Sequence, residues 1–248
     1  IGHLYPKVKV PAELGGGEAT VIAWIWARTV RCPNPACGSE MPLVRSFILS
    51  KKKGNEAYVK PVNNNGNISY TVEYGMNSPE GTVNRKGAKC YFCGDAVGFP
   101  YIREEGRQGR MRNRLIAIVA EGKNGRLFVS PDEEHNLIAN VKKPDDFPDA
   151  MIPNNPRNFT TPNYGMENFA SLFTNRQLTA LTTLSSLVRE AQKKAEEDAI
   201  AAGMSNDQIP LDQGGKGAKA YGQAVVVYLS FVINKIADYN SSICSWHN

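Results

Sequence analysis

Four of the five cysteines form two closely spaced pairs. Cys32 and Cys37 lie in Cys-Pro-Asn-Pro-Ala-Cys-Gly, and Cys90 and Cys93 lie in Cys-Tyr-Phe-Cys-Gly. A structural zinc site takes four thiolates in a tetrahedron, and each pair supplies two ligands from one turn. Backbone N–H groups around such a turn point at the sulfur atoms and share their negative charge. The spacing therefore predicts structural Zn²⁺ at Cys32, Cys37, Cys90 and Cys93; disulfides and redox chemistry are the alternatives.

The segment before the first pair must position Cys32. Residues 19–31 are rich in β-branched and aromatic side chains, which favour a strand that runs directly into Cys32. Alternation along this strand places Trp24, Trp26, Arg28 and Val30 on one face. A buried helix is the competing interpretation.

Strand patterns also fill the sequence between and after the cysteine pairs. Such patterns cover residues 43–50, 58–62, 68–74, 115–121 and 126–130. Asn65-Gly66 and the stretch from Gly122 to Gly125 are hairpin signals between neighbouring strands. The order of these segments is that of a zinc ribbon: a strand, a cysteine pair, hairpins and a second cysteine pair.

The C-terminal part has a helical pattern. Before it, Ser130 is a predicted N-cap of a short helix, with Pro131 at its first position. Thr174 and Gln177 form a predicted capping box that begins a helix extending to Gly203. An apolar stripe over residues 221–239 predicts a second helix, and we expect the two helices to pack on each other or on another domain.

These patterns predict an α+β fold. Its parts are a zinc-ribbon-containing antiparallel β domain over residues 1–143, a linker over 144–165 and a two-helix region over 166–248. The linker is assigned because proline, asparagine and aspartate dominate there.

Composition indicates a soluble protein of the reducing cytoplasm. The mean hydropathy is −0.37, and we expect no membrane partner because no apolar run approaches the roughly 20 residues of a span. No secretory leader is visible, and the chain begins with Ile1, so we expect a piece of a longer polypeptide. The fifth cysteine, Cys244, lies near His247 and is expected to be a half-buried, unreactive thiol.

Basic residues concentrate in the predicted zinc-bearing half. Residues 1–143 carry 21 Lys and Arg against 13 Asp and Glu, whereas 144–248 carry 8 against 11. This asymmetry favours a polyanionic partner, because guanidinium groups pair with phosphate in bidentate fashion. The candidate nucleic-acid contacts are Lys51, Lys52, Lys53, Arg103, Arg107, Arg110, Arg112 and Arg114. A merely solvated basic face is the alternative.

Catalytic patterns are not visible. His3, His135 and His247 are scattered, so spacing indicates no nucleophile with a neighbouring base. Four cysteine ligands also leave zinc without an open coordination position.

Several segments together resemble a prokaryotic family of adenine-specific DNA methylases that contain a zinc ribbon. The matching segments are 24–38, 41–47, 105–107, 165–166, 172–174 and 237–241. In that family an S-adenosylmethionine-binding motif lies upstream and a catalytic Asp-Pro-Pro-Tyr motif downstream, and this sequence has neither. The resemblance implies an insert between the two halves of the methyltransferase core, where related enzymes recognise DNA; its cysteine pairs correspond to Cys32, Cys37, Cys90 and Cys93.

The resulting hypothesis is a zinc-binding DNA-recognition insert of an S-adenosylmethionine-dependent methyltransferase, without catalytic residues of its own. S-adenosylmethionine would bind only to the longer protein, and the helices would contact its methyltransferase core. A structural or protein-interaction module and an RNA-binding ribbon remain open as alternatives.

Overall fold

The computed structural model describes residues 1–64, 67–123, 125–155 and 157–246, and the chain divides into two compact units. The β unit comprises Gly2–Ala139, Met151–Asn168 and Ser245–Asn248, and the helical unit comprises Ile1, Asn140–Ala150 and Phe169–Cys244. The predicted segments divide the chain in sequence order, whereas these units interleave. The α+β prediction is confirmed, with antiparallel sheets in one unit and a long helix pair in the other.

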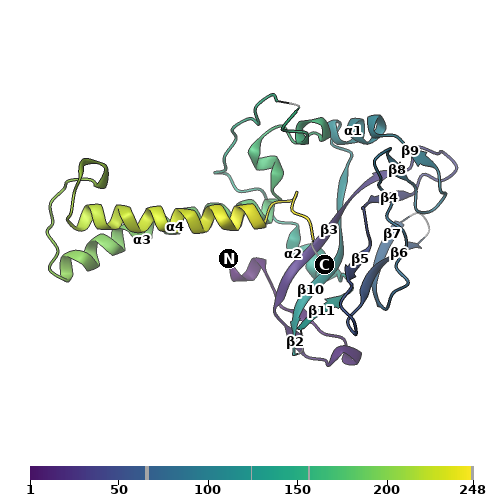
Figure 1. The fold of residues 1–248 in the computed structure, drawn as a ribbon, viewed down its shortest axis with the longest axis horizontal. Coiled ribbons are helices and arrows are strands. Elements are labelled where there is room, and N and C mark those ends of the chain that lie inside the picture. Colours follow the sequence, from purple (N-terminus) through teal and green to yellow (C-terminus); the bar gives the residue numbers. More distant parts are fainter. Residues whose placement is uncertain (65–66, 124, 156, 247–248) are drawn as a thin grey trace. The chain divides into compact units, whose positions relative to one another are not determined.

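A four-stranded antiparallel sheet forms the centre of the β unit (Figure 1). Its strand order is β11-β10-β3-β4, with β3 (Val21–Arg31) and β10 (Arg112–Gly122) in the middle. Strands β11 (Gly125–Val129) and β4 (Glu40–Leu43) lie at its edges. The strand predicted before Cys32 is thus confirmed over the competing helix. The predicted hairpin of β10 and β11 is also confirmed, although Asn124 lies outside the described residues.

A three-stranded sheet pairs β5 (Ile48–Ser50), β6 (Ala57–Asn64) and β7 (Asn67–Tyr74) in that order. The pairing of β6 with β7 confirms that hairpin, although Asn65 and Gly66 of the predicted turn lie outside the described residues. The prediction of one strand over residues 43–50 is wrong. The segment is divided between β4 and β5, which belong to different sheets, because the chain leaves the first sheet after Leu43.

Apolar side chains from both sheets form one hydrophobic cluster. Ala27 and Ala117 come from the four-stranded sheet, Val59 and Tyr70 from the three-stranded sheet, and Phe47 precedes β5. Trp24 and Trp26 instead pack on the other face of β3, against Leu115 and Ile118. The alternation predicted for β3 is therefore confirmed. The tryptophans lie on one face of the sheet, and the opposite face, which carries Ala27, packs on the three-stranded sheet.

Short elements complete the β unit. They are η1 (Gly2–Leu4), β1 (Val8–Lys9), η2 (Ala12–Leu14), β2 (Glu18–Ala19), β8 (Ala88–Lys89), β9 (Ala96–Val97), α1 (Phe99–Arg107), α2 (Glu133–Ala139) and η3 (Thr161–Tyr164). The last of these lies within the segment predicted as a linker and packs on α1. A Cβ atom on Gly106 of α1 would lie 2.6 Å from the backbone oxygen of Tyr164, so only glycine permits this approach.

Helix α2 begins differently from the prediction. Ser130 is not its N-cap, because the Ser130 hydroxyl accepts a hydrogen bond from the backbone N–H of Val72 at 2.9 Å. The Asp132 carboxylate caps the helix instead by accepting from the N–H of His135 at 2.7 Å. The buried His135 ring in turn accepts a hydrogen bond from the indole N–H of Trp24 at 2.9 Å, which fastens α2 to β3.

The helical unit consists mainly of α3 (Asn175–Ala201) and α4 (Ala218–Tyr239), with η4 (Phe169–Leu172) and η5 (Leu211–Gln213) beside them. The predicted capping box is confirmed: the N–H of Gln177 donates to the hydroxyl of Thr174, and the Gln177 side chain accepts from the N–H of Thr174. Gly222 lets α4 approach α3 closely, because a Cβ atom there would lie 2.4 Å from Cγ of Glu196.

Helix α4 has an apolar and largely exposed surface. Tyr228, Phe231 and Tyr239 are each more than 60% exposed. By length and composition, α4 is long and apolar enough to cross a membrane. The mean hydropathy of an 18-residue window within it is 1.3, and 11% of that window is buried in the structure. The expectation that no apolar run approaches a span's length is therefore wrong for this segment. One such helix is weak evidence for a membrane, and the absence of a membrane partner stays a prediction.

Candidate metal centre

Each cysteine pair lies in the connection between two antiparallel strands. Cys32 follows β3 directly, and Cys37 comes shortly before β4. Cys90 follows β8 and Cys93 precedes β9 in the same manner. The two connections are closed by matching backbone hydrogen bonds, from the N–H of Cys32 to the oxygen of Ser39 at 2.9 Å and from the N–H of Cys90 to the oxygen of Asp95 at 2.8 Å.

The turns that carry the thiols depend on glycine. Gly38 and Gly94 have φ angles of 52° and 80°, in the left-handed region that side chains disfavour. The N–H of Gly38 donates to the oxygen of Asn34 at 2.9 Å, and that of Gly94 donates to the oxygen of Cys90 at 3.0 Å. The glycine after each pair therefore allows the chain to reverse and return to a strand.

The four sulfur atoms converge on one point. Cys32 and Cys93 have Sγ atoms 3.7 Å apart, Cys37 and Cys90 have Sγ atoms 3.8 Å apart, and all four atoms lie within 4.8 Å of one another. A zinc ion with Zn–S bonds of about 2.3 Å at the centre of a tetrahedron requires S–S separations of about 3.8 Å. The donor set and its spacing thus fit a metal ion such as zinc.

Contacts outside the thiols fix the two turns against each other. The side-chain amide of Asn34 donates to the carboxylate of Asp95 at 2.6 Å, which joins the first turn to the second. Around the thiols, Val30, Met41, Val97 and Ile102 form a buried cluster that includes Cys32 and Cys90. The site is therefore supported by a hydrophobic cluster of its own, on which α1 also packs.

The surroundings of Cys32, Cys37 and Cys90 shift the pKa values of these thiols. Burial raises the pKa of the Cys32 and Cys90 thiols, although backbone N–H groups from Asn34, Phe92 and Cys93 act in the opposite direction. Hydrogen bonds from the side chain and backbone of Ser39 lower the pKa of Cys37 to about 7. Because zinc binds thiolates, its uptake must release protons, and the apparent affinity falls as the pH decreases.

The chemistry of such a site is structural. Four thiolates fill a tetrahedral zinc ion and leave no position for water or substrate. Cys244 stands apart from the tetrad in the helical unit. It is exposed rather than half-buried, its thiol donates to the backbone oxygen of Asp238 at 3.1 Å, and His247 lies outside the described residues.

The predicted basic contacts do not form one cluster. Lys51, Lys52 and Lys53 lie exposed in the connection between β5 and β6, where the N–H of Asn55 closes a turn on Lys52. Arg103 and Arg107 lie on α1, Arg110 lies in the connection after it, and Arg112 and Arg114 lie on β10. The stretch 103–114 is thus a helix followed by a strand, and its side chains point to different surroundings.

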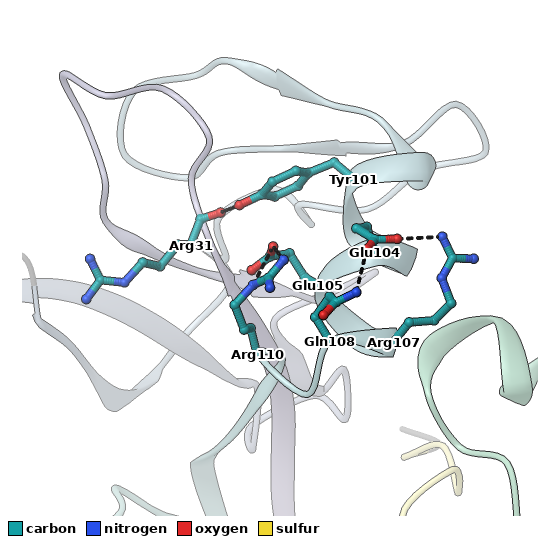
Figure 2. A network of polar contacts seen from close by, with 7 residues as sticks. All are labelled: Arg31, Tyr101, Glu104, Glu105, Arg107, Gln108 and Arg110. Carbon is teal, nitrogen blue, oxygen red and sulfur yellow. Dashed lines mark hydrogen bonds and ion pairs between the residues drawn. The ribbon is translucent and has the colours of Figure 1, made fainter.

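Two arginines near α1 are paired with neighbouring carboxylates (Figure 2). Arg107 contacts Glu104 at 2.7 Å on the exposed side of the helix. Arg110 donates two hydrogen bonds, at 2.6 and 3.0 Å, to the buried carboxylate of Glu105. Arg107 and Arg110 would each have to give up an ion pair to contact a phosphate, and their predicted phosphate contacts stay predictions.

A third pair lies on β10. Arg114 donates to both oxygens of Glu40, at 2.8 and 2.6 Å, and Glu40 also accepts from the hydroxyl of the buried Thr29. Burial alone raises the pKa of Glu40, but these hydrogen bonds and the charges of Arg114 and Arg112 outweigh it and lower that pKa. Arg114 is therefore paired with Glu40, and its predicted contact with phosphate stays a prediction.

The other two arginines remain exposed. Arg103 lies over the rings of Phe99 and Tyr164, 5.9 Å from each centroid, and Arg112 forms no ion pair within the described part of the chain. Sequence reasoning missed Arg31, which lies exposed at the end of β3 on the same face as Thr29. The sequence does contain a signal for Arg31: alternation along β3 places it on the face opposite Trp24 and Trp26.

Comparisons with known proteins do not identify a family. No protein-family model matches the chain, and neither the curated proteins nor the solved structures contain a significant match. The resemblance to adenine-specific DNA methylases therefore stays a prediction from the sequence segments.

Proposed function

We propose that this chain is a zinc-stabilised DNA-recognition module that belongs to an S-adenosylmethionine-dependent adenine-specific DNA methyltransferase of the cytoplasm. The observation that carries the nucleic-acid part is the excess of basic over acidic side chains in the unit that contains the cysteine tetrad. That unit has 20 Lys and Arg against 14 Asp and Glu, whereas the helical unit has 9 against 10. The methyltransferase part is supported by the sequence resemblance, and the free thiols suit a reducing compartment.

Zinc has a positioning role in this proposal. Cys32 and Cys37 fix the connection between β3 and β4, and those strands carry Arg31 and Glu40. Cys90 and Cys93 fix the turn that precedes α1. A metal at the tetrad would therefore hold the basic β surface in a defined shape, and the chain's arginines and lysines would provide the affinity for phosphate.

A nucleic-acid titration tests the proposal. The zinc-loaded chain is titrated with duplex DNA, single-stranded DNA and RNA of matched length at 50 and 200 mM salt. We expect duplex binding that weakens at the higher salt concentration, because each neutralised phosphate releases counterions. Absence of binding at 50 mM salt contradicts any nucleic-acid role, and binding of RNA alone identifies the partner as RNA rather than DNA.

A structural or protein-interaction module is the second candidate. It is favoured by the pairing of Arg107, Arg110 and Arg114 with carboxylates, because each of these arginines would have to give up an ion pair to contact a phosphate. It is also favoured by the exposed apolar side chains of α4. The same titration separates the two functions, because this candidate predicts no salt-dependent binding to any nucleic acid.

A further inference from the structure

One face of the four-stranded sheet gathers arginines from two strands. In the register of β10 with β3, Arg112 lies opposite Thr29 and Arg114 lies opposite Ala27. In the register of β3 with β4, Arg31 lies opposite Glu40. Because residues two apart on a strand share a face, Arg31, Arg112 and Arg114 all project from the side that carries Thr29.

The acid on this face is already engaged. Glu40 accepts two hydrogen bonds from Arg114 and one from Thr29, so both oxygens of its carboxylate already have donors. Within the described residues, neither Arg31 nor Arg112 forms a salt bridge, and both side chains are exposed. Two guanidinium groups therefore face solvent beside one neutralised pair.

The spacing of the two free arginines is fixed by the backbone. Thr29 is opposite Arg112, and Arg31 is two residues further along β3, so Arg31 and Arg112 are diagonal neighbours with backbones about 7–8 Å apart. The hydroxyl of Tyr101 donates to the backbone oxygen of Arg31 at 3.0 Å and ties the end of β3 to α1. Figure 2 shows the Arg31 side chain extending away from α1, on the far side of that hydrogen bond.

The arginines beside α1 differ from this pair in their partners. Arg107 and Arg110 each contact a glutamate, at 2.7 and 2.6 Å, and would have to give up an ion pair to bind a phosphate. Arg31 and Arg112 have no such ion-pair partner among the described residues, and they project from paired strands, whereas Arg110 lies in the connection after α1. Sites on strands hold their geometry better than sites on loops.

We infer that Arg31 and Arg112, exposed at the end of β3 and the start of β10 where the three-stranded sheet does not cover this face, form the phosphate-binding pair through which the β unit binds the backbone of DNA, while Arg114 stays paired with Glu40. The inference rests on the proposed function and names the residues that carry it. Each guanidinium offers a planar pair of N–H donors that matches a phosphate group. Lys51, Lys52 and Lys53 would then add positive charge near the DNA, without determining where its backbone lies.

The test measures salt dependence rather than affinity alone. Dissociation constants for one duplex are measured between 50 and 300 mM KCl for the zinc-loaded wild type and for Arg31→Gln with Arg112→Gln. On duplex DNA, the slope of log affinity against log salt decreases by about 0.9 for each phosphate that the protein no longer neutralises. We expect the double variant to have a slope smaller by about 1.8, because both guanidinium groups are removed.

A matched variant controls for charge. Arg107→Gln with Arg110→Gln removes the same number of positive charges, and we expect it to keep the wild-type slope within about 0.5. Zinc content and circular dichroism establish that both double variants are folded, and Arg31→Lys with Arg112→Lys supplies a conservative pair that retains most of the slope. A wild-type slope in Arg31→Gln/Arg112→Gln overturns the inference but leaves DNA binding intact, whereas a wild type that binds no DNA contradicts the proposed function itself.

Discussion

The two units differ in how their secondary structure is stabilised. In the β unit, Cys32 meets Cys93 across 61 residues and Glu40 meets Arg114 across 74. In the helical unit the capping box and the pair of Lys194 with Asp198 join residues three or four apart. Helices of this kind form from local contacts, whereas closing long loops costs entropy that a metal can offset. We therefore expect zinc to decide the stability of one unit and leave the other nearly unchanged.

The largest effect is expected for Cys90→Ala. Structural zinc contributes on the order of 10–16 kcal/mol of apparent binding free energy in small zinc domains, which rivals the total stability of a domain. The variant should lose zinc, and amide hydrogen exchange should become fast in β3, β4 and α1 while α3 and α4 stay protected. Cys244→Ala, outside the tetrad, is the control and should keep its zinc. Full zinc content in Cys90→Ala is incompatible with a site at the tetrad.

A change in the helical unit should produce the opposite pattern. Gly222→Leu places a side chain where Cβ alone would lie 2.4 Å from Cγ of Glu196, and overpacking of this kind costs roughly 1–3 kcal/mol. Urea unfolding followed by hydrogen exchange should show α3 and α4 destabilised while zinc content stays at the wild-type level. Val227→Leu, at an exposed position of the same helix, should be nearly neutral. Equal stability of the two variants contradicts close packing at Gly222.

Within the β unit, Glu40→Gln tests the polar contact that spans β4 and β10. It removes a carboxylate that accepts three hydrogen bonds, two of them from Arg114, and we expect a loss of about 1–2 kcal/mol in urea unfolding of the zinc-loaded chain at pH 7. Glu104→Gln breaks the more exposed pair with Arg107 and should cost clearly less, because solvent screens that pair. If the two variants lose the same free energy of unfolding, the greater burial of the Glu40–Arg114 pair does not make it more stabilising than the Glu104–Arg107 pair.

The smallest effect is expected at the start of α3. Thr174→Ala removes the hydroxyl that accepts from the N–H of Gln177, which costs about 1 kcal/mol. The loss should appear as faster hydrogen exchange in the first turns of α3 and should leave the β unit unaffected. Ser186→Ala, an exposed position inside the same helix, should not destabilise it. Protection that is unchanged in Thr174→Ala shows that the cap contributes little.

Patterns local in sequence predicted the fold well. The spacing of Cys32, Cys37, Cys90 and Cys93 predicted their convergence, because each pair is carried by one turn and strands flank both. The β6–β7 and β10–β11 hairpins and the capping box at Thr174 follow from signals contained within a few residues.

Contacts between distant residues were beyond the reach of these patterns. The sequence from Arg103 to Arg114 has a high density of arginine, but whether an arginine is free depends on carboxylates such as Glu40, 74 residues away from Arg114. The cap of α2 shifted from Ser130 to Asp132 because Ser130 has a partner in β7. Alternation along β3 places Arg31 opposite the tryptophan face, but whether its side chain lacks an ion-pair partner depends on how β3, β4 and β10 pair.

Metal analysis of the purified full chain is the most direct test of the central claim that the tetrad holds the β unit together. We predict about one zinc ion per chain, and replacement by Co²⁺ should give the absorption of a tetrahedral site with thiolate ligands. Removal of the metal by a chelator should abolish hydrogen-exchange protection in β3 and β4 and leave α3 and α4 protected. A metal-free chain whose β unit is fully protected would contradict this claim.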